Sequence, residues 1–241
     1  MCTVTYVPLP NDDFILTSNR DESPLRKTLA PDFHEDSGVK LLYPMDKHAG
    51  GTWIGISDKN RLICVLNGGF EKHKRKESYR KSRGLIAKDL LKCKSLLNAI
   101  EDLDCEGIEP FTMILIDWGT ERKAFELIWD EKEKVFRELP EKSSIWSSSS
   151  LYDSQMKSIR KKWFDNYKLM QDLTAESIWH FHTSAGNDNE DYGVIMNRGY
   201  VQTTSITQVS KTDARIEMTH TDLLTNKTEH KFMLTPKLSH G

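Results

Sequence analysis

The second residue of the chain carries a thiol directly after the initiator methionine. Methionine is removed from nascent chains when the next residue is small, and its removal would leave Cys2 with both a thiol and a free α-amine. The reference pKa is about 8.5 for a thiol and about 7.7–8.0 for an α-amino group. The amine can therefore accept the thiol proton near pH 7, directly or through water. Met1-Cys2 predicts an N-terminal nucleophile, and a cysteine without catalytic role is the alternative.

A block of polar side chains, Asn19–Glu22, follows the predicted strand Phe14–Thr17. A first strand is predicted at Thr3–Val7, and the Pro-Asn-Asp-Asp turn between the two strands indicates a hairpin. A hairpin would return the polar block to the neighbourhood of Cys2. An acid there could orient the α-amine, and Arg20 would favour the thiolate over the thiol. An ordinary surface salt-bridge cluster at a strand end is the alternative.

The rest of the chain alternates between strand and helix patterns. Apolar residues recur at helical spacing from Ile86 to Ile100 and from Tyr152 to Met170, and Thr174 is a candidate N-cap for a short third helix. The remaining strands are expected at Thr52–Ile56, Leu62–Leu66, Phe111–Ile116, Ala124–Trp129, Val135–Leu139, Gly193–Met196, Tyr200–Thr204, Arg215–His220 and Glu229–Leu234. The stretches 22–46 and 71–83 are expected to be polar loops. This order predicts an α+β fold with largely antiparallel sheets, in a single domain over residues 1–241.

The composition of the chain excludes several classes of function. Hydrophobic residues make up 37% of the 241 residues and charged residues 29%, with a net charge of -2, so no overall field favours nucleic acid. The four cysteines form no framework-like spacing, and no run is long enough for a membrane span or a signal peptide. We therefore expect a cytoplasmic protein without disulfides. His180 and His182 lack an evident third ligand nearby, so no metal or other cofactor is predicted.

Four motifs occur in a recognisable order. They are Met1-Cys2-Thr3, Ser18-Asn-Arg-Asp-Glu22, Gly50-Gly-Thr-Trp-Ile-Gly55 and Leu66-Asn-Gly-Gly69. Together they resemble the NRDE-motif proteins, the group that includes the transport and Golgi organisation family. That family is similar to the cysteine-type N-terminal-nucleophile hydrolases, such as choloylglycine hydrolase and penicillin V acylase. The resemblance implies a four-layer αββα sandwich with the N-terminal residue at the end of a central strand.

The resemblance also implies roles for individual residues. Cys2 matches the nucleophile, Arg20 the arginine beside the thiol, and Asp21 the aspartate that holds the α-amine. Asn67 is similar to an asparagine that helps to form the oxyanion hole, where one donor contributes about 3–4 kcal/mol. Glu22 could take the place of Asp21 if the loop shifts by one residue. Further pocket residues are expected to be Asn19, Trp53 and Ser148, the last standing where these hydrolases usually carry an asparagine.

Two functions are compatible with these residues. The first is an amidase-type acyl transfer on a carbon–nitrogen bond other than a peptide bond, with a small acyl or amide ligand and Cys2 as nucleophile. The second is a non-enzymatic role in binding or trafficking haem, a lipid or an acyl ligand in the same pocket, which the resemblance to the transport and Golgi organisation family implies. A free Cys2 thiolate could ligate haem iron.

Overall fold

The computed structural model describes residues 2–234. These residues form two compact units, each built on one antiparallel sheet. The first unit contains residues 2–26 and 141–234, and the second unit contains residues 27–140.

The sheet of the first unit has the strand order β10-β1-β2-β11-β12-β13. Its strands are β1 (Cys2–Pro8), β2 (Phe14–Glu22), β10 (Ser144–Ser147), β11 (Gln202–Thr212), β12 (Arg215–Asp222) and β13 (Lys227–Leu234). The hairpin predicted for the first two strands is confirmed, since β1 and β2 pair in antiparallel register from Cys2 opposite Arg20 to Pro8 opposite Phe14. Both strands are buried almost throughout, which explains their continuous runs of apolar and small polar residues.

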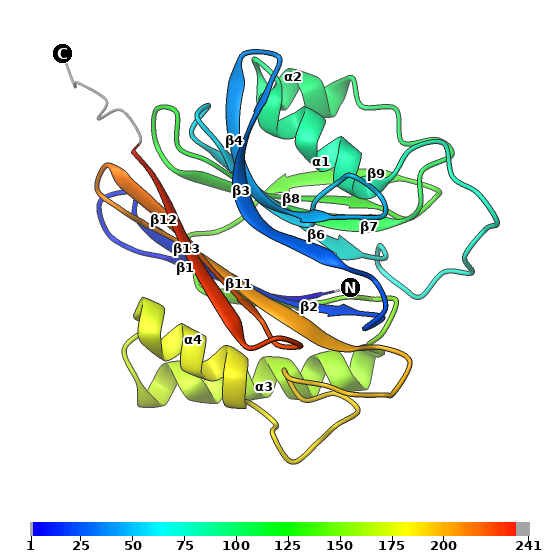
Figure 1. Cartoon of the computed structure of the whole chain (residues 1–241), viewed down its shortest axis with the longest axis vertical. Coiled ribbons are helices and arrows are strands. Elements are labelled where there is room, and N and C mark those ends of the chain that lie inside the picture. Colours follow the sequence, from blue (N-terminus) through cyan, green and yellow to red (C-terminus); the bar gives the residue numbers. More distant parts are fainter. Residues whose placement is uncertain (1, 235–241) are drawn as a thin grey trace. The chain divides into compact units, whose positions relative to one another are not determined.

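Two helices, α3 (Ser154–Met170) and α4 (Ala175–Ser184), lie against one face of this sheet (Figure 1). The apolar residues between helices and sheet form a core of Val7, Ile15, Phe164, Ile178, Phe181 and Val194. The predicted cap of α4 is confirmed: Thr174 accepts from the Ser177 N–H, and the Ser177 side chain bonds back to the Thr174 N–H. The helix α3 begins at Ser154 and not at Tyr152 as predicted, because Asp153 is its N-cap.

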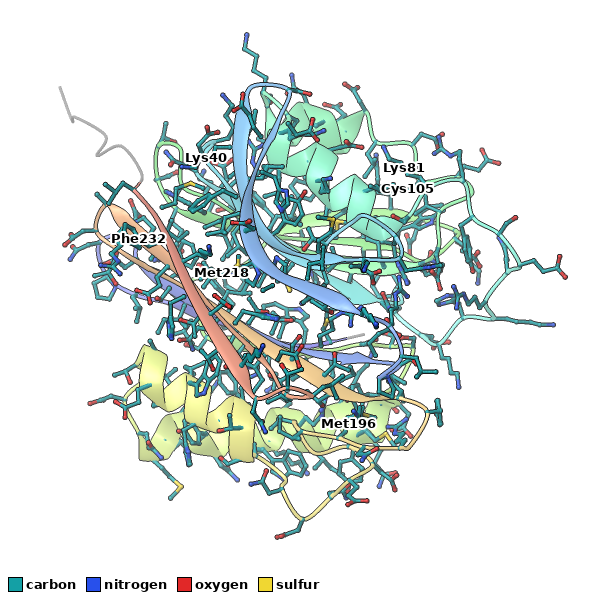
Figure 2. All side chains as sticks on the ribbon, viewed as in Figure 1. Lys40, Lys81, Cys105, Met196, Met218 and Phe232 are labelled. Atoms are coloured by element: carbon teal, nitrogen blue, oxygen red, sulfur yellow. The ribbon has the colours of Figure 1, made fainter. Side chains whose placement is uncertain are left out.

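The second unit is a meander with the strand order β3-β4-β5-β6-β7-β8-β9. Its strands are β3 (Thr28–Asp36), β4 (Val39–Asp46), β5 (Ile54–Ser57), β6 (Arg61–Asn67), β7 (Phe111–Asp117), β8 (Lys123–Trp129) and β9 (Lys134–Glu138). The helices α1 (Arg83–Lys92) and α2 (Leu96–Glu101) cover one face (Figure 1). Buried residues from strands and helices share one apolar cluster, to which Cys105 (labelled in Figure 2) also belongs.

Several predicted elements were wrong. The stretch 22–46 is not a loop but contains the hairpin β3-β4, whose outer strand has a single buried residue and so needs no apolar alternation. Its Pro31 lies where the register shifts, a position at which a missing N–H costs least. The helix expected from Ile86 to Ile100 is two helices, because Ser95 caps a new one. No strand forms at 193–196, whereas β10 forms at a place where the sequence predicts no strand.

No helix within residues 2–234 is long and apolar enough to cross a bilayer.

Candidate active site

Cys2 begins β1 and lies directly opposite Arg20 on β2. Residues paired in this way place their side chains on the same face of a sheet, with β-carbons about 5 Å apart. Both are buried, Cys2 completely and Arg20 with 3% of its surface exposed. The prediction that the polar block returns to Cys2 is therefore confirmed, and the thiol and the guanidinium share one face.

Ser148 lies on the other side of Cys2, just beyond the end of β10. Its backbone N–H donates to the Cys2 carbonyl oxygen at 3.0 Å, continuing the β1–β10 register that pairs Thr3 with Ser147. Continuation of this register places the Ser148 side chain on the same face as Cys2. Its hydroxyl is within hydrogen-bond distance of the Ser150 hydroxyl, at 2.8 Å. Cys2 thus has Ser148 on one side and Arg20 on the other.

Asp21 follows Arg20 and therefore points to the opposite face, toward the helices. It is fully buried, and its two carboxyl oxygens accept from the Tyr152 hydroxyl at 2.7 Å and the Thr203 hydroxyl at 2.8 Å. Thr203 in turn accepts from the N–H of Met196 (labelled in Figure 2), so its own proton is available to Asp21. Burial raises the pKa of Asp21, while the charge of Arg160 and the two hydroxyl donors act in the opposite direction.

Arg160 is the charged centre of this helix-side network. It is fully buried on α3 and donates to the Thr3 hydroxyl at 2.6 Å, the Ser147 hydroxyl at 3.1 Å, and the carbonyls of Tyr192 and Gly193. Its guanidinium also stacks on the Tyr152 ring, 3.7 Å from the centroid. Burial and the nearby Asp21 charge raise the pKa of Tyr152 well above 10, so the phenol stays protonated and keeps donating. Arg160 therefore compensates the buried Asp21 charge through space, and it joins α3 to the strands β1 and β10 and to the segment 192–193 that follows α4.

Asn19 also points away from the Cys2 face. Its amide donates to the carbonyls of His182 and Val194, and its oxygen lies 2.6 Å from His182 Nδ1. Since that oxygen can only accept, His182 donates from Nδ1 and its Nε2 accepts from the Thr5 hydroxyl at 2.8 Å. Burial, with the charge of Arg160 adding to it, lowers the pKa of His182 to about 3 and keeps the ring neutral. Asn19 thus links β2 by hydrogen bonds to α4 and to the segment that follows it.

Glu22 returns to the face of Cys2 and Arg20, two residues along β2. Its carboxylate lies 3.7 Å from the Arg20 guanidinium and 3.4 Å from that of Arg26. Burial alone would raise the pKa of Glu22, but surrounding positive groups, including both arginines, and the N–H of Ser23 lower it. Asp21 and Glu22, the two predicted candidates for holding the α-amine, therefore lie on opposite faces in different surroundings.

Asn67 and Trp53 belong to the second unit. Asn67 is the last residue of β6, opposite Phe111 on β7. Trp53 precedes β5 and is 7% exposed, and its carbonyl accepts from the Val65 N–H at 2.7 Å. Their participation with Cys2 stays a prediction.

Comparison with known proteins identifies the family. The chain matches the Transport and Golgi organisation 2 family over residues 1–232. It belongs to that family. The sequence also matches an uncharacterised protein of Saccharomyces cerevisiae, YGR127W, with 34% identity over 82 residues. This match covers 32% of the chain and 26% of the yeast protein, so the chain spans about a quarter of the length of that relative.

Solved structures confirm the predicted fold class. Penicillin V acylase from Agrobacterium tumefaciens is similar with a TM-score of 0.55 and 10% identity, over 97% of this chain and 86% of that one. Conjugated bile acid hydrolase from Clostridium perfringens gives a TM-score of 0.55 at 10% identity over 99% of both chains. The Caenorhabditis elegans ortholog of N-acylethanolamine-hydrolysing acid amidase gives a TM-score of 0.61 at 10% identity, over 86% of this chain and 92% of that one. This family member therefore has an α+β fold of the N-terminal-nucleophile hydrolase type; at such identities the likeness concerns the fold alone.

Sequence reasoning missed the helix-side network of Tyr152, Arg160 and Thr203. The helical spacing places Tyr152 in an apolar stripe, and the strand pattern predicts a strand at Thr203 but no partner for its hydroxyl. The burial of Arg160 could have been predicted from its spacing. It lies four residues from both Met156 and Phe164 and so occupies a core position of α3. A lone arginine on the apolar face of a helix indicates a buried charge that needs partners.

Among residues 2–234, no group of three or more His, Cys, Asp or Glu side chains is arranged to hold a metal ion.

Proposed function

We propose that this protein is an amide-cleaving acyl transfer enzyme in which Met1 is removed and Cys2 acts as the nucleophile. The observation that carries the proposal is the register of β1 and β2, which sets Cys2 opposite Arg20 with Asp21 as the next residue. Because the strands run antiparallel, the backbone nitrogen of Cys2 lies on the side toward Asp21. A released α-amine would thus lie next to the backbone of Asp21, whose buried carboxylate is its proposed partner.

In the proposed reaction, the neutral α-amine takes the proton from the Cys2 thiol. Arg20, on the same face, favours the thiolate through its positive charge. The sulfur attacks the acyl carbon of the substrate, forming a C–S bond and a tetrahedral oxyanion. Collapse breaks the C–N bond, the α-ammonium returns its proton to the leaving amine, and water then hydrolyses the thioester to release the acid.

The oxyanion needs donors at the place where its charge develops. Asn67, by its resemblance, and a backbone N–H are the proposed donors, and loss of one such donor costs about 3–4 kcal/mol of transition-state stabilisation. The acylase, bile acid hydrolase and acid amidase with the same fold support a carbon–nitrogen bond in a small molecule as the target. The substrate would then be an N-acyl amide rather than a peptide.

Mass spectrometry of the purified protein tests the proposal in two steps. The intact mass should lack Met1, and brief incubation with N-acyl amides should add one acyl group to the wild type. The Cys2→Ala variant should stay unmodified, whereas Cys64→Ala, which removes another fully buried thiol, should still be acylated. Retention of Met1, or acylation that is equal in Cys2→Ala, contradicts the proposal.

Haem or acyl-ligand binding without turnover is the competing function, and the same samples address it. Haem titration with a Soret shift in the wild type that disappears in Cys2→Ala, without any acyl adduct, would establish binding in place of catalysis.

A further inference from the structure

Two buried hydroxyls on the Cys2 face of the first unit's sheet have no hydrogen-bond partner. They belong to Ser18 on β2, which is 0% exposed, and Ser205 on β11, which is 1% exposed, and neither Oγ is paired within residues 2–234. Leaving a buried hydroxyl unpaired costs about 1–3 kcal/mol. Because buried polar groups in proteins are nearly always satisfied, two such groups in one place indicate a ligand that they receive.

The two hydroxyls flank Arg20. Ser205 is paired directly with Arg20 across β2 and β11, and Ser18 precedes Arg20 by two residues on the same strand, so all three share the face of Cys2. An irregularity between Thr203 and Ser205 sets Thr204 beside Arg20. The Thr204 hydroxyl accepts from Arg20 Nη1 at 3.4 Å and donates to the Arg20 carbonyl at 3.1 Å, which holds the arginine along its strand.

The hydroxyl of Thr207, which neighbours Ser18 on the same face, does have a hydrogen-bond partner within the protein. Thr207 lies opposite Ser18 on β11, and its Oγ1 is 2.8 Å from Nδ1 of His220 on β12. Burial lowers the pKa of His220 to about 4, so this ring is neutral and adds no charge. Thr207 is thus satisfied by the fold, while Ser18 and Ser205 are not.

The charged groups around Ser18 and Ser205 favour a ligand that accepts hydrogen bonds. The carboxylate of Glu22 offsets part of the positive charge of Arg20, but it also forms an ion pair with Arg26. Asp222, opposite Ser205, accepts from the N–H groups of Leu224 and Thr225 with one oxygen. Two hydroxyl donors beside a guanidinium match a group that only accepts hydrogen bonds and carries negative charge.

We infer that Ser18, Arg20 and Ser205, hereafter the serine–arginine strip, form a subsite for a carboxylate on the substrate. The strip begins one strand away from Cys2, and neighbouring strands are about 4.8 Å apart. A carboxylate held there lies a few atoms from an acyl carbon at Cys2. The substrate class is accordingly the N-acyl amino acids with a short amine part, as opposed to neutral N-acyl alcohol amines; this rests on the proposed function.

Binding to the Cys2→Ala protein tests the subsite without turnover. Titration calorimetry would compare N-decanoylglycine with N-decanoylethanolamine, which share the acyl chain and the amide and differ in carboxylate versus hydroxyl. The glycine compound should bind at least tenfold more tightly. Adding Ser18→Ala and Ser205→Ala should reduce this preference at least tenfold, because each hydroxyl bond to a charged acceptor is worth about tenfold or more. Equal affinity for the two compounds, or an unchanged preference in the double variant, overturns the inference.

A matched control lies in the second unit. Ser57 on β5 is 1% exposed and its hydroxyl is also unpaired, so Ser57→Ala makes the same chemical change elsewhere and should leave the preference intact. Thermal unfolding adds a second readout. Ser18→Ala and Ser205→Ala should not lower the melting temperature, since no bond within the protein is lost, and a drop of several degrees would show structural hydroxyls and overturn the subsite.

Incubation of wild-type protein with the same two compounds separates the two proposals. Preferential binding of the glycine compound without any acyl adduct on wild-type protein supports the subsite and contradicts the hydrolase. Turnover of both compounds at equal kcat/KM supports the hydrolase and overturns the subsite.

Discussion

The hydroxyl of Tyr152 is the most informative single atom to remove. It donates to Asp21 at 2.7 Å in a fully buried place, and the Asp21 carboxylate has one other hydroxyl donor, from Thr203. Both carboxyl oxygens accept hydrogen bonds, which is the pattern of the ionised form. Tyr152→Phe keeps the ring that stacks under Arg160 and deletes only this donor.

The expected effect follows from the charge on the acceptor. A hydrogen bond to a charged group contributes about 1.5–3 kcal/mol, so Tyr152→Phe should lower the free energy of unfolding by about 2 kcal/mol at pH 7. This is about a 30-fold change in the folding equilibrium and about 4–8 °C in melting temperature for a chain of this size. The loss should shrink as the pH falls toward the pKa of Asp21, which burial holds above its ordinary value of 3.8, because protonation removes the charge that Tyr152 stabilises.

Urea unfolding at several pH values between 4 and 8 measures this effect. Tyr167→Phe is the matched control, since the Tyr167 hydroxyl donates at 2.7 Å to the neutral Ser177 carbonyl and its loss should be independent of pH over this range. A Tyr152→Phe penalty that is absent at pH 7, or equal at pH 4 and pH 8, would falsify the idea that Tyr152 stabilises an ionised Asp21.

Three further outcomes are expected. The folded-state pKa of His182 is about 3, below its ordinary 6.5, so only the unfolded chain takes up this proton as the pH falls from 6.5 toward 3; between pH 7 and 5 the wild type should lose about 2 kcal/mol of unfolding free energy more than His182→Gln, and equal pH slopes would contradict this. Gly84→Ala would bring a β-carbon within 2.7 Å of the Thr52 carbonyl oxygen, so urea unfolding should show a loss of about 2 kcal/mol, whereas a neutral result would mean that α1 can shift freely. Thr174→Ala removes one half of the capping box of α4 and should cost about 1 kcal/mol by the same assay, with no loss expected only if the Ser177 bonds suffice alone.

The hairpin that joins Cys2 to Arg20 could be predicted because its causes are local. A turn signal between two strand-forming runs sets the register, and the register sets which residues are opposite each other. The cap at Thr174 was predictable for the same reason, since it depends on residues three apart. The order of the four motifs predicts the family and the fold. The strands β3 and β10 could not be predicted, because exposed or short strands need little apolar alternation.

The face to which each side chain turns was decided by the tertiary structure. Strand alternation says that Arg20 and Asp21 point in opposite directions, but only the packing of α3 shows that Asp21 is the one that faces buried donors. Tyr152, Arg160 and Thr203 reach Asp21 and its neighbours from positions more than a hundred residues away, and no local rule links them. The thiol at position 2 and the polar block after it are visible in the sequence; the charge network behind them exists only once the sheet and its helices have packed.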